Sequence, residues 1–555
     1  MSRLSTLAAQ FLPVALALIA ALIGGRWPIR EGGRIERWGT GAWAPWLVGM
    51  MSAAAFGIVW GSLSPVATIH DEAAYLLQAR LLATGRLVGP GRPLPEFFEQ
   101  FQTFVTPVVA AKYPLGFPLA LVPGIWLGMP ALMPLLLNGI AGGLFFALTR
   151  RLASPSVAAL AWLIWLLAPG TILYHASYLS EILSGPLWLA AWWCLLEWSK
   201  TGSWKWLTGL SITIAACAIT RPLTAVGLAL PCAAVVLTGV WRRRQWLQLA
   251  IAATAGAMVL SPLFYQNVRV TGHWSMTPWE RYADVYAPVD RPGFTIDTRP
   301  PERPIPKDMQ DYIVAFTAAH VGFEPSRLPV ILAARLEQIF RDAWREWVPS
   351  LALLALIGLV TGGRELQFGM ACAGSLVIVH LIFAHPLNWS LYYQEGQPAL
   401  AAATALGIGW VIAFVTRRAR RQETIASSWR PVLAVWLTVA CAAAIGTAVV
   451  PEARERHEKV AAFHEHFREL IDTLPGPAIV FVRYTQIHPF WKSLIDNPPD
   501  LDHARNWVVR DRGTDNARLT ALAPGRLPYL FLERGNLLEP LTAGGDSILR
   551  QPPVP

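Results

Sequence analysis

Long apolar runs separated by short polar stretches make up most of the chain. The runs have the length at which a helix crosses the hydrocarbon core of a bilayer, and counting them predicts about twelve membrane-spanning helices. The expected spans lie at residues 7–24, 45–63, 133–148, 157–173, in a run ending near Lys200, and at 206–219, 223–240, 247–265, 348–360, 366–383, 398–415 and 431–450.

Composition supports this interpretation. Hydrophobic residues make up 54% of the 555 residues and charged residues only 15%, which excludes an ordinary soluble domain. The net charge of +10 would suit nucleic acid, but the arginines form short clusters between apolar runs, which membrane topology explains better. All five cysteines lie inside apolar runs without metal-site spacing. We therefore expect an all-α polytopic membrane protein that binds no nucleic acid.

Basic clusters orient the predicted spans. Lys and Arg collect on the cytoplasmic side, so the arginines within 26–37, 242–244 and 417–421 mark the inner face. This rule puts a set of polar residues on the outer face: Asp71, Glu72, Lys112, His175, Tyr178, Glu181, Arg221, Tyr392, Tyr393 and Glu395. Ionisable groups at the membrane edge are costly, so their collection on one side predicts a site there. In a two-membrane bacterium, this is the periplasmic face of the inner membrane.

The stretch 70–87 follows the second span and carries two adjacent acids. We expect a helix that Asp71 caps and Gly85 ends, because a carboxylate accepts the free N–H groups of a first turn and glycine adopts the left-handed conformation easily. Ala74, Leu77 and Leu81 form its apolar stripe. The pattern fits a helix on the membrane surface as well as a helix that presents Asp71 to a site.

Two cations are open to two interpretations each. The polar segment at about residues 68–117, between two predicted spans, is the first outer excursion. Lys112, near its end, is either a snorkelling anchor or a point charge for a lipid phosphate. Arg221, followed by a proline between two apolar runs, is either part of a surface turn or a charge held in a cavity.

A series of short motifs carries a family resemblance. In chain order they are Asp71-Glu72, Tyr75-Leu76-Leu77-Gln78-Ala79-Arg80, Lys112-Tyr113-Pro114-Leu115-Gly116, Tyr178-x-Ser180-Glu181, Thr220-Arg221-Pro222 and Tyr392-Tyr393-x-Glu395. Their order and shared sidedness, over about residues 45–415, resemble the GT-C membrane glycosyltransferases. Within that class the chain looks like the bacterial branch related to protein O-mannosyltransferases and lipid A aminoarabinose transferases.

The resemblance implies transfer of a sugar from a polyprenyl-phosphate carrier to a lipid, polysaccharide or protein acceptor. Asp71 matches the acid that acts on the acceptor as base or orienter, and Glu72 matches the second acid of the pair. Lys112 falls where relatives carry a phosphate-binding Lys, although this chain has Lys-Tyr-Pro-Leu in place of a Lys-Pro-Pro-like motif. Arg221 would be a second phosphate partner. Residues implied in the sugar or acceptor pocket are His175, Tyr178, Glu181, Tyr393 and Glu395.

The implied chemistry suits these residue types. A carboxylate can take the acceptor's proton, and a phosphate leaving group needs cations more than a general acid. Adjacent residues 71 and 72 cannot flank one bond, which argues against a two-carboxylate glycosidase. No cofactor is indicated, and a divalent metal stays open because two neighbouring acids offer oxygen ligands. His464-Glu465-His466 is interpreted as a solvated helix face rather than a zinc site.

Three regions result. Residues 1–44 hold the first span and a cytoplasmic basic loop; residues 45–450 form the GT-C-like region, with outer loops at 67–117 and 266–346; and residues 451–555 form a small periplasmic α/β domain. The second loop is expected to be loop-like and Pro-rich, then helical over 326–347. In the last domain we expect a helix at 456–473 and strands at 478–482, 505–510 and 527–532.

Two other classes of function remain open. A transporter or flippase of lipid-linked saccharides would carry polar groups on a path to both faces, often in symmetric repeats. The inner loops of this chain are short and basic, and the sequence shows no internal repeat, which disfavours this class. A non-catalytic envelope assembly protein would tolerate the loss of Asp71, Lys112 or Arg221 individually.

Overall fold

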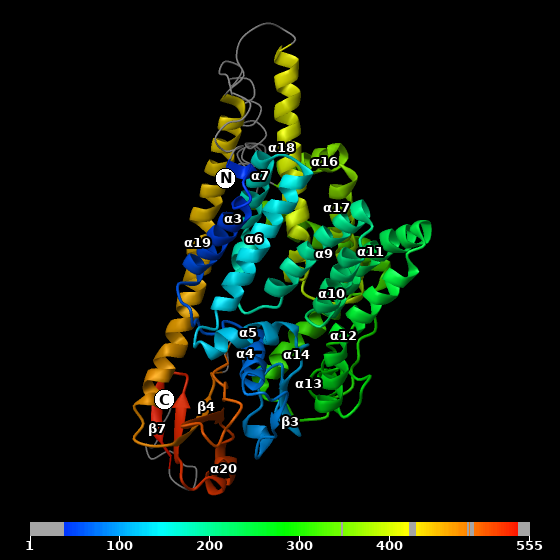
Figure 1. Cartoon of the computed structure of the whole chain (residues 1–555). Coiled ribbons are helices and arrows are strands. Elements are labelled where there is room, and N and C mark those ends of the chain that lie inside the picture. The colour runs from blue at the N-terminus through cyan, green and yellow to red at the C-terminus, as the bar shows by residue number, and fades with distance from the viewer. Residues whose placement is uncertain (1–37, 346–347, 421–428, 486–487, 489–492, 542–555) are drawn as a thin grey trace.

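The computed structural model describes residues 38–345, 348–420, 429–485, 488 and 493–541. Apolar helices pack side by side at one end of the molecule, and short strands, further helices and a C-terminal sheet gather at the other (Figure 1). The long helix α19 (Trp429–Asp472) runs between the two ends along one side. The span predicted at residues 7–24 lies outside the described residues.

The other predicted spans are helical in the structure. The apolar helices are α3 (Ala44–Trp60), α5 (Gly116–Trp126), α6 (Leu132–Leu152), α7 (Pro155–Leu166), α8 (Pro169–His175), α9 (Glu181–Thr201), α10 (Trp204–Ala218), α11 (Pro222–Arg243), α12 (Trp246–Thr271), α16 (Val348–Thr361), α17 (Arg364–Val379) and α18 (Gln397–Arg420). By length and composition, four of the described helices can cross a membrane, or up to six spans form if two bent helix pairs each count as one. The chain is therefore a helical membrane protein, and the count of about twelve spans stays a prediction.

Glycines let two pairs of these helices, α3 with α6 and α16 with α18, approach each other closely. A Cβ atom on Gly49 of α3 would lie 2.7 Å from the carbonyl oxygen of Gly139 on α6. A Cβ atom on Gly358 of α16 would lie 1.8 Å from the carbonyl oxygen of Ala403 on α18. Small residues at such contacts let membrane helices gain van der Waals packing where lipid leaves little hydrophobic driving force.

The helix predicted at 70–87 is α4 (His70–Ala83), but its cap differs from the prediction. The helix begins at His70, after an extended Ile69, and Asp71 makes no capping hydrogen bond. Glu72 instead accepts the backbone N–H of Thr68 at 2.5 Å, which satisfies the entry to the helix and frees Asp71 for another partner. The predicted stop is confirmed, since Gly85 has φ of +73° just beyond the end of the helix.

The segment 266–346, which the sequence predicts on the outer face, is more helical than expected. It contains α13 (Pro278–Tyr286), α14 (Lys307–His320) and α15 (Leu328–Trp344), and only the last was expected. Thr277 and Glu280 form a capping box at the start of α13, which the Pro-rich composition concealed. Apolar residues of α13 and α14 pack with Phe101 and Phe104 of the first outer excursion, so tertiary burial stabilises both helices.

The C-terminal region folds around a four-stranded sheet of order β5-β4-β6-β7. Its strands are β4 (Ala478–Arg483), β5 (Asn506–Arg510), β6 (Leu527–Leu532) and β7 (Leu537–Pro540), with the short helix α20 (Asn516–Leu522). The first three strands were predicted, and β7 was not. β4 pairs in parallel with both β5 and β6, whereas β7 pairs antiparallel with β6.

The last span and the helix expected at 456–473 form one continuous helix, α19, which passes through the position near Val450 where the boundary was predicted. Pro451 removes one backbone donor, yet the helix continues through it into a run of good helix formers, Glu452-Ala453-Arg454-Glu455. At its far end, Phe467, Ile471 and Leu474 pack against the sheet. The last span therefore leads without a linker into the C-terminal region.

The first outer excursion packs against this sheet. It contains β1 (Gly89–Pro90), β2 (Thr103–Phe104) and β3 (Val108–Ala111) in the order β1-β3-β2. Phe97 and Phe98 enter the same buried cluster as Phe481 and Trp507 of the sheet. Arg510 Nε also donates to the backbone oxygen of Glu99 at 2.7 Å. Two regions far apart in the sequence are thus joined on one side of α4.

Candidate active site

Asp71 lies at the start of α4 and remains partly exposed, with 29% of its side chain accessible. The Tyr113 hydroxyl donates a hydrogen bond to Asp71 Oδ1. His70 Nε2 lies 3.5 Å from the same oxygen. Burial lowers the pKa of His70, which favours a neutral imidazole beside this carboxylate. Asp71 is therefore an accessible acid with one hydrogen-bond donor directed at it.

Glu72, the second predicted acid, is buried and makes structural hydrogen bonds. Its side chain accepts hydrogen bonds from Thr68 N at 2.5 Å, Thr68 Oγ1 at 3.2 Å and Tyr178 N at 3.1 Å. The residue is 1% exposed, and burial raises the pKa of its carboxyl group. The Tyr178 hydroxyl donates to Pro65 O at 3.2 Å. The two adjacent acids thus have different surroundings, and Glu72 holds the helix entry against the 174–181 loop.

Lys112 is one residue before Tyr113 and is fully buried. Its Nζ lies 2.9 Å from Oδ2 of Asp290, and both side chains are 1% exposed. The ammonium group also lies 3.9 Å from the ring centroid of Trp279 and 5.1 Å from that of Tyr282. Cation–π attraction and one ion pair together compensate the buried charge. Sequence reasoning missed Asp290 and Trp279, because both come from the second outer loop, over 160 positions away along the chain.

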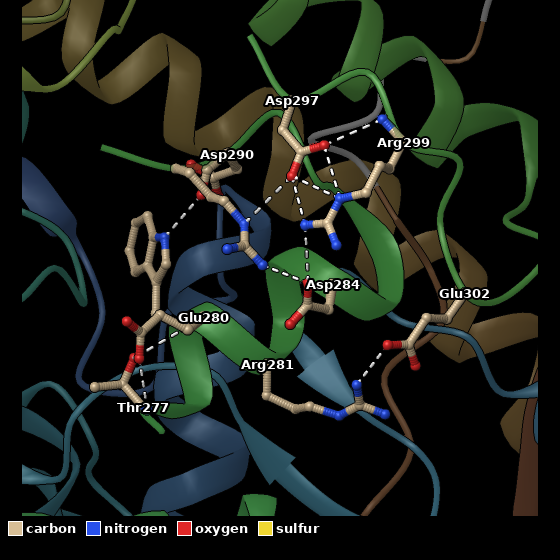
Figure 2. A network of polar contacts seen from close by, with 10 residues as sticks. Thr277, Glu280, Arg281, Asp284, Asp290, Asp297, Arg299 and Glu302 are labelled. Atoms are coloured by element: carbon tan, nitrogen blue, oxygen red, sulfur yellow. Dashed lines mark hydrogen bonds and ion pairs between the residues drawn. The ribbon is translucent and has the colours of Figure 1, made fainter. Parts of the chain in front are cut away.

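A network of ion pairs fixes the chain around Asp290. Figure 2 shows Asp284, Asp297 and Arg299 joined by dashed contacts beside Asp290. Arg299 Nη2 lies 2.6 Å from Asp297 Oδ2, and hydrogen bonds from Arg299 hold the pKa of Asp297 at about 2. The Trp279 indole donates to the backbone oxygen of Asp290 at 3.0 Å. Asp290 is therefore held at Lys112 by its own main chain as well as by the ion pair.

Arg221 forms a second charged group with two predicted pocket residues. Its Nη1 lies 2.8 Å from Glu181 Oε1, and its Nε lies 3.5 Å from Glu395 Oε1. Ser184 donates to Glu395 from one turn along α9. The three ionisable residues come from the start of α9, the start of α11 and the 3-10 turn η6 (Leu391–Gly396). The cavity interpretation of Arg221 is favoured over the surface turn, since its side chain is only 11% exposed.

Aromatic residues join the two charged groups. The Tyr75 ring stacks on Tyr113 with centroids 4.6 Å apart, and its hydroxyl donates to Ser180 Oγ at 3.1 Å, next to Glu181. Burial raises the pKa of the Tyr392 hydroxyl, and Asp290 and Asp71 raise it further. Tyr392 also lies 5.8 Å from the Arg221 guanidinium, measured from Cζ to the ring centroid. Asp71, Lys112 and Arg221 therefore surround one aromatic region.

Two predicted pocket residues lie in other environments. His175 Nδ1 is 2.6 Å from Asn138 Oδ1, and its ring stacks on Phe56 among the apolar helices. The Tyr393 hydroxyl is 2.9 Å from His385 Nε2. Nothing in the geometry brings either side chain to Asp71, so their pocket role rests on the sequence alone.

A cavity of about 420 Å³ lies on the other side of His70. α4, the first outer excursion, the end of α19 and the C-terminal sheet all contribute to its wall. Its charged lining consists of Arg80, Arg468 and Asp496, with Arg80 3.6 Å from Asp496, and His464 also lines it. His464 therefore lines a cavity, whereas a solvated face was predicted. Within the described ranges, no group of three or more His, Cys, Asp and Glu side chains could hold a metal ion.

Comparison with known proteins gives a likeness of structure. No family model and no curated protein matches the chain. ArnT from Cupriavidus metallidurans, solved bound to undecaprenyl phosphate, superposes with a TM-score of 0.52 and 13% identity, covering 88% of this chain and 93% of that one. The apo form of the same protein gives 0.52 and 14%, with 89% and 93% covered. The protein has the GT-C fold. Arabinosyltransferase EmbB from Mycobacterium smegmatis also matches, at a TM-score of 0.40 and 14% identity over 81% of this chain and 45% of that one.

The GT-C fold confirms the resemblance that the order of motifs predicted. Because identity is so low, the likeness extends to the fold and leaves the roles of individual residues as predictions. Within this GT-C fold, β3, α13, α14 and the C-terminal sheet gather at the same end as α4, the helix that carries Asp71 (Figure 1).

Proposed function

We propose that the protein is an integral membrane glycosyltransferase that moves a sugar from a polyprenyl-phosphate-linked donor to an acceptor hydroxyl at the outer, periplasmic face. The observation that carries the proposal is the contact of Tyr113 with Asp71, because Tyr113 directly follows Lys112. The Lys112 ammonium lies 5.4 Å from the centroid of the Tyr113 ring, so the carboxylate and the cation both contact Tyr113. ArnT, which shares the fold, was solved with undecaprenyl phosphate, and this supports a donor of that class.

In the proposed reaction, an acceptor oxygen attacks the anomeric carbon of the donor sugar. A bond forms between that carbon and the acceptor oxygen, the bond to the donor phosphate oxygen breaks, and the phosphate leaves with the electron pair. Asp71 takes the acceptor's proton, and the Tyr113 hydrogen bond fixes the orientation of the carboxylate. The leaving phosphate is already ionised, so it needs a nearby cation rather than a general acid.

Formal charge ranks the two cations proposed for the donor phosphate. Lys112 and Asp290 form a neutral pair, whereas Arg221 faces two carboxylates and its group carries an excess negative charge if both are ionised. A phosphate is therefore repelled less at Lys112, which we propose as its first partner, with Arg221 as the second. Since Lys112 is buried under Asp290, donor binding must displace that carboxylate.

The cavity beside His70 is the proposed route of the acceptor. The C-terminal region forms part of its wall, and His70, the residue before Asp71, lines it as well. Arg80 is paired with Asp496 in its lining, so Arg468 supplies the positive charge that an anionic acceptor would meet there.

Transfer of radiolabelled sugar from polyprenyl-phosphate donors tests the proposal in membranes with matched protein levels. We expect Asp71→Asn to lose transfer and the control Asp472→Asn, an exposed acid at the end of α19, to keep it. Equal transfer by Asp71→Asn and the wild type would refute the role of Asp71. Absence of transfer from every donor, with the wild type folded, would favour the transporter instead.

A further inference from the structure

A second cavity, of about 300 Å³, lies in the C-terminal region, away from Asp71. Residues that follow β4 and β5 line one wall, and the first turn of α14 lines the other. The volume is at the lower end of the range for small-molecule pockets, about 300–1,000 Å³. Neither the active-site proposal nor the acceptor route uses this cavity.

Sheet topology places the cavity where parallel sheets bind ligands. The chain passes from the central strand β4 to β5 on one side and then to β6 on the other, so the strand order reverses beside β4. Arg483 and Arg510 are the last residues of β4 and β5, and both line the cavity. Crevices outside the carboxyl ends of parallel strands, at such a reversal, are the usual ligand positions of open α/β sheets.

His488 supplies an unused hydrogen-bonding group in this wall. The residue is 6% exposed, and its ring stacks on Tyr484 with centroids 3.9 Å apart. Nδ1 lies 2.7 Å from Glu533 Oε1, which anchors that edge of the ring. The other nitrogen, Nε2, is buried and has no hydrogen-bond partner among the described residues. Buried polar groups are normally paired, so Nε2 points to a ligand.

The lining has an excess of positive charge. Four basic side chains and two acidic ones face the cavity besides His488: Lys307, Arg483, Arg510 and Arg512, with Asp311 and Asp511. Arg483 and Asp511 neutralise each other at 2.5 Å. Lys307 and Arg512 lie exposed at the rim on opposite walls, one from α14 and one after β5. Two rim cations above a buried imidazole suit a ligand with several anionic oxygens.

We propose that this cavity binds a phosphate group, carried by a free sugar phosphate or by a lipid headgroup. Lys307 and Arg512 bind its oxygens at the rim. The Nδ1–H of His488 donates to Glu533, which holds the imidazole in place. The neutral ring then accepts at Nε2 from a hydroxyl of the phosphate group, and the imidazolium donates from Nε2 to a phosphate oxygen. The site would tie the second outer loop to the C-terminal sheet, because its two cations come from these two regions.

Calorimetric titration of the full-length protein in nanodiscs with inorganic phosphate and with glucose 1-phosphate tests the proposal. We expect saturable binding by the wild type and a loss of about tenfold in affinity in His488→Gln and in Lys307→Gln, as for a hydrogen bond to a charged group. The matched control is Arg341→Gln, an exposed cation on α15 paired with Glu337. The double variant Lys112→Met with Asp290→Ala removes the cation proposed for the donor phosphate, so phosphate binding that persists in this variant separates this site from the proposed transferase function.

Two nanodisc compositions distinguish the ligand sources. If a lipid headgroup is the ligand, phosphatidylglycerol should compete with inorganic phosphate and phosphatidylcholine should not; without such competition, a soluble phosphate is the ligand. Should His488→Gln fail to fold, the rim variants Lys307→Gln and Arg512→Gln carry the same test, because both side chains are exposed. Absence of phosphate binding by the wild type, or equal affinity in the rim variants and Arg341→Gln, would overturn the proposal.

Discussion

The Tyr113 hydroxyl donates its hydrogen bond to Asp71 Oδ1, which joins the return strand of the first outer excursion to the start of α4. This contact orients the carboxylate in the proposed mechanism. We expect Tyr113→Phe to lower the transfer rate about tenfold while the protein still folds, since the ring is kept and one hydrogen bond to a charged group is lost. Tyr265→Phe, which removes an exposed hydroxyl bonded to Arg269, is the control. An unchanged rate in Tyr113→Phe would remove Tyr113 from the mechanism.

The two adjacent acids should respond differently to substitution. Glu72→Ala removes a buried acceptor of three hydrogen bonds, so we expect a marked loss of folded protein in detergent. Asp71→Asn should leave the amount of folded protein unchanged and abolish transfer. Size-exclusion profiles and the transfer assay, run on both variants, measure the two effects. Equal loss of folded protein in both would mean that the acids have the same structural role.

The buried pair Lys112–Asp290 gives a prediction about stability. Asp290→Ala leaves the Lys112 ammonium buried without its counter-ion, which is expected to cost about 3–5 kcal/mol. The double variant Lys112→Met with Asp290→Ala should recover part of this loss, because no unpaired charge remains. Denaturation of the four proteins of this cycle in the same detergent gives the coupling. Additive losses would show that the two charges do not interact.

Loss of the Arg221 cation should destabilise the folded protein more than loss of the Glu395 charge. Arg221→Met leaves Glu181 and Glu395 facing each other without a cation, so we expect poor folding. Glu395→Gln removes the excess negative charge and keeps an acceptor for Ser184, so its folding should resemble the wild type. Midpoints of thermal unfolding compare the two. A more severe effect of Glu395→Gln would contradict this account of the charges.

His70 predicts a pH dependence of stability. Burial, partly offset by Asp71, lowers its pKa below the ordinary 6.5, so below pH 6.5 the unfolded chain binds more protons at this residue than the folded protein does. Stability must then fall as the pH drops from 6.5 toward the folded pKa, and it is fully present above 6.5. In His70→Asn, the midpoint of unfolding should change less with pH over that interval than in the wild type. The same slope in the variant and the wild type would assign the dependence to other groups.

The sequence by itself determined the helical membrane architecture, the GT-C fold, the predicted C-terminal strands and the end of α4 near Gly85. These follow from apolar run length, motif order, alternation and the left-handed preference of glycine, all of which act over short stretches. Helix α13 shows the limit of this reasoning, because its capping box lies in Pro-rich surroundings and its apolar face is buried only by distant Phe101 and Phe104.

Only the tertiary structure decided which charges meet. Lys112 meets Asp290 across 178 positions, and Arg221 meets Glu181 and Glu395 from separate helices. The adjacent acids Asp71 and Glu72 have different partners: Glu72 bonds to Thr68 at the start of the helix, and Asp71 bonds to Tyr113. Buried charges must find partners wherever the fold brings them, and the attraction depends on distance in space and on desolvation, neither of which sequence spacing records.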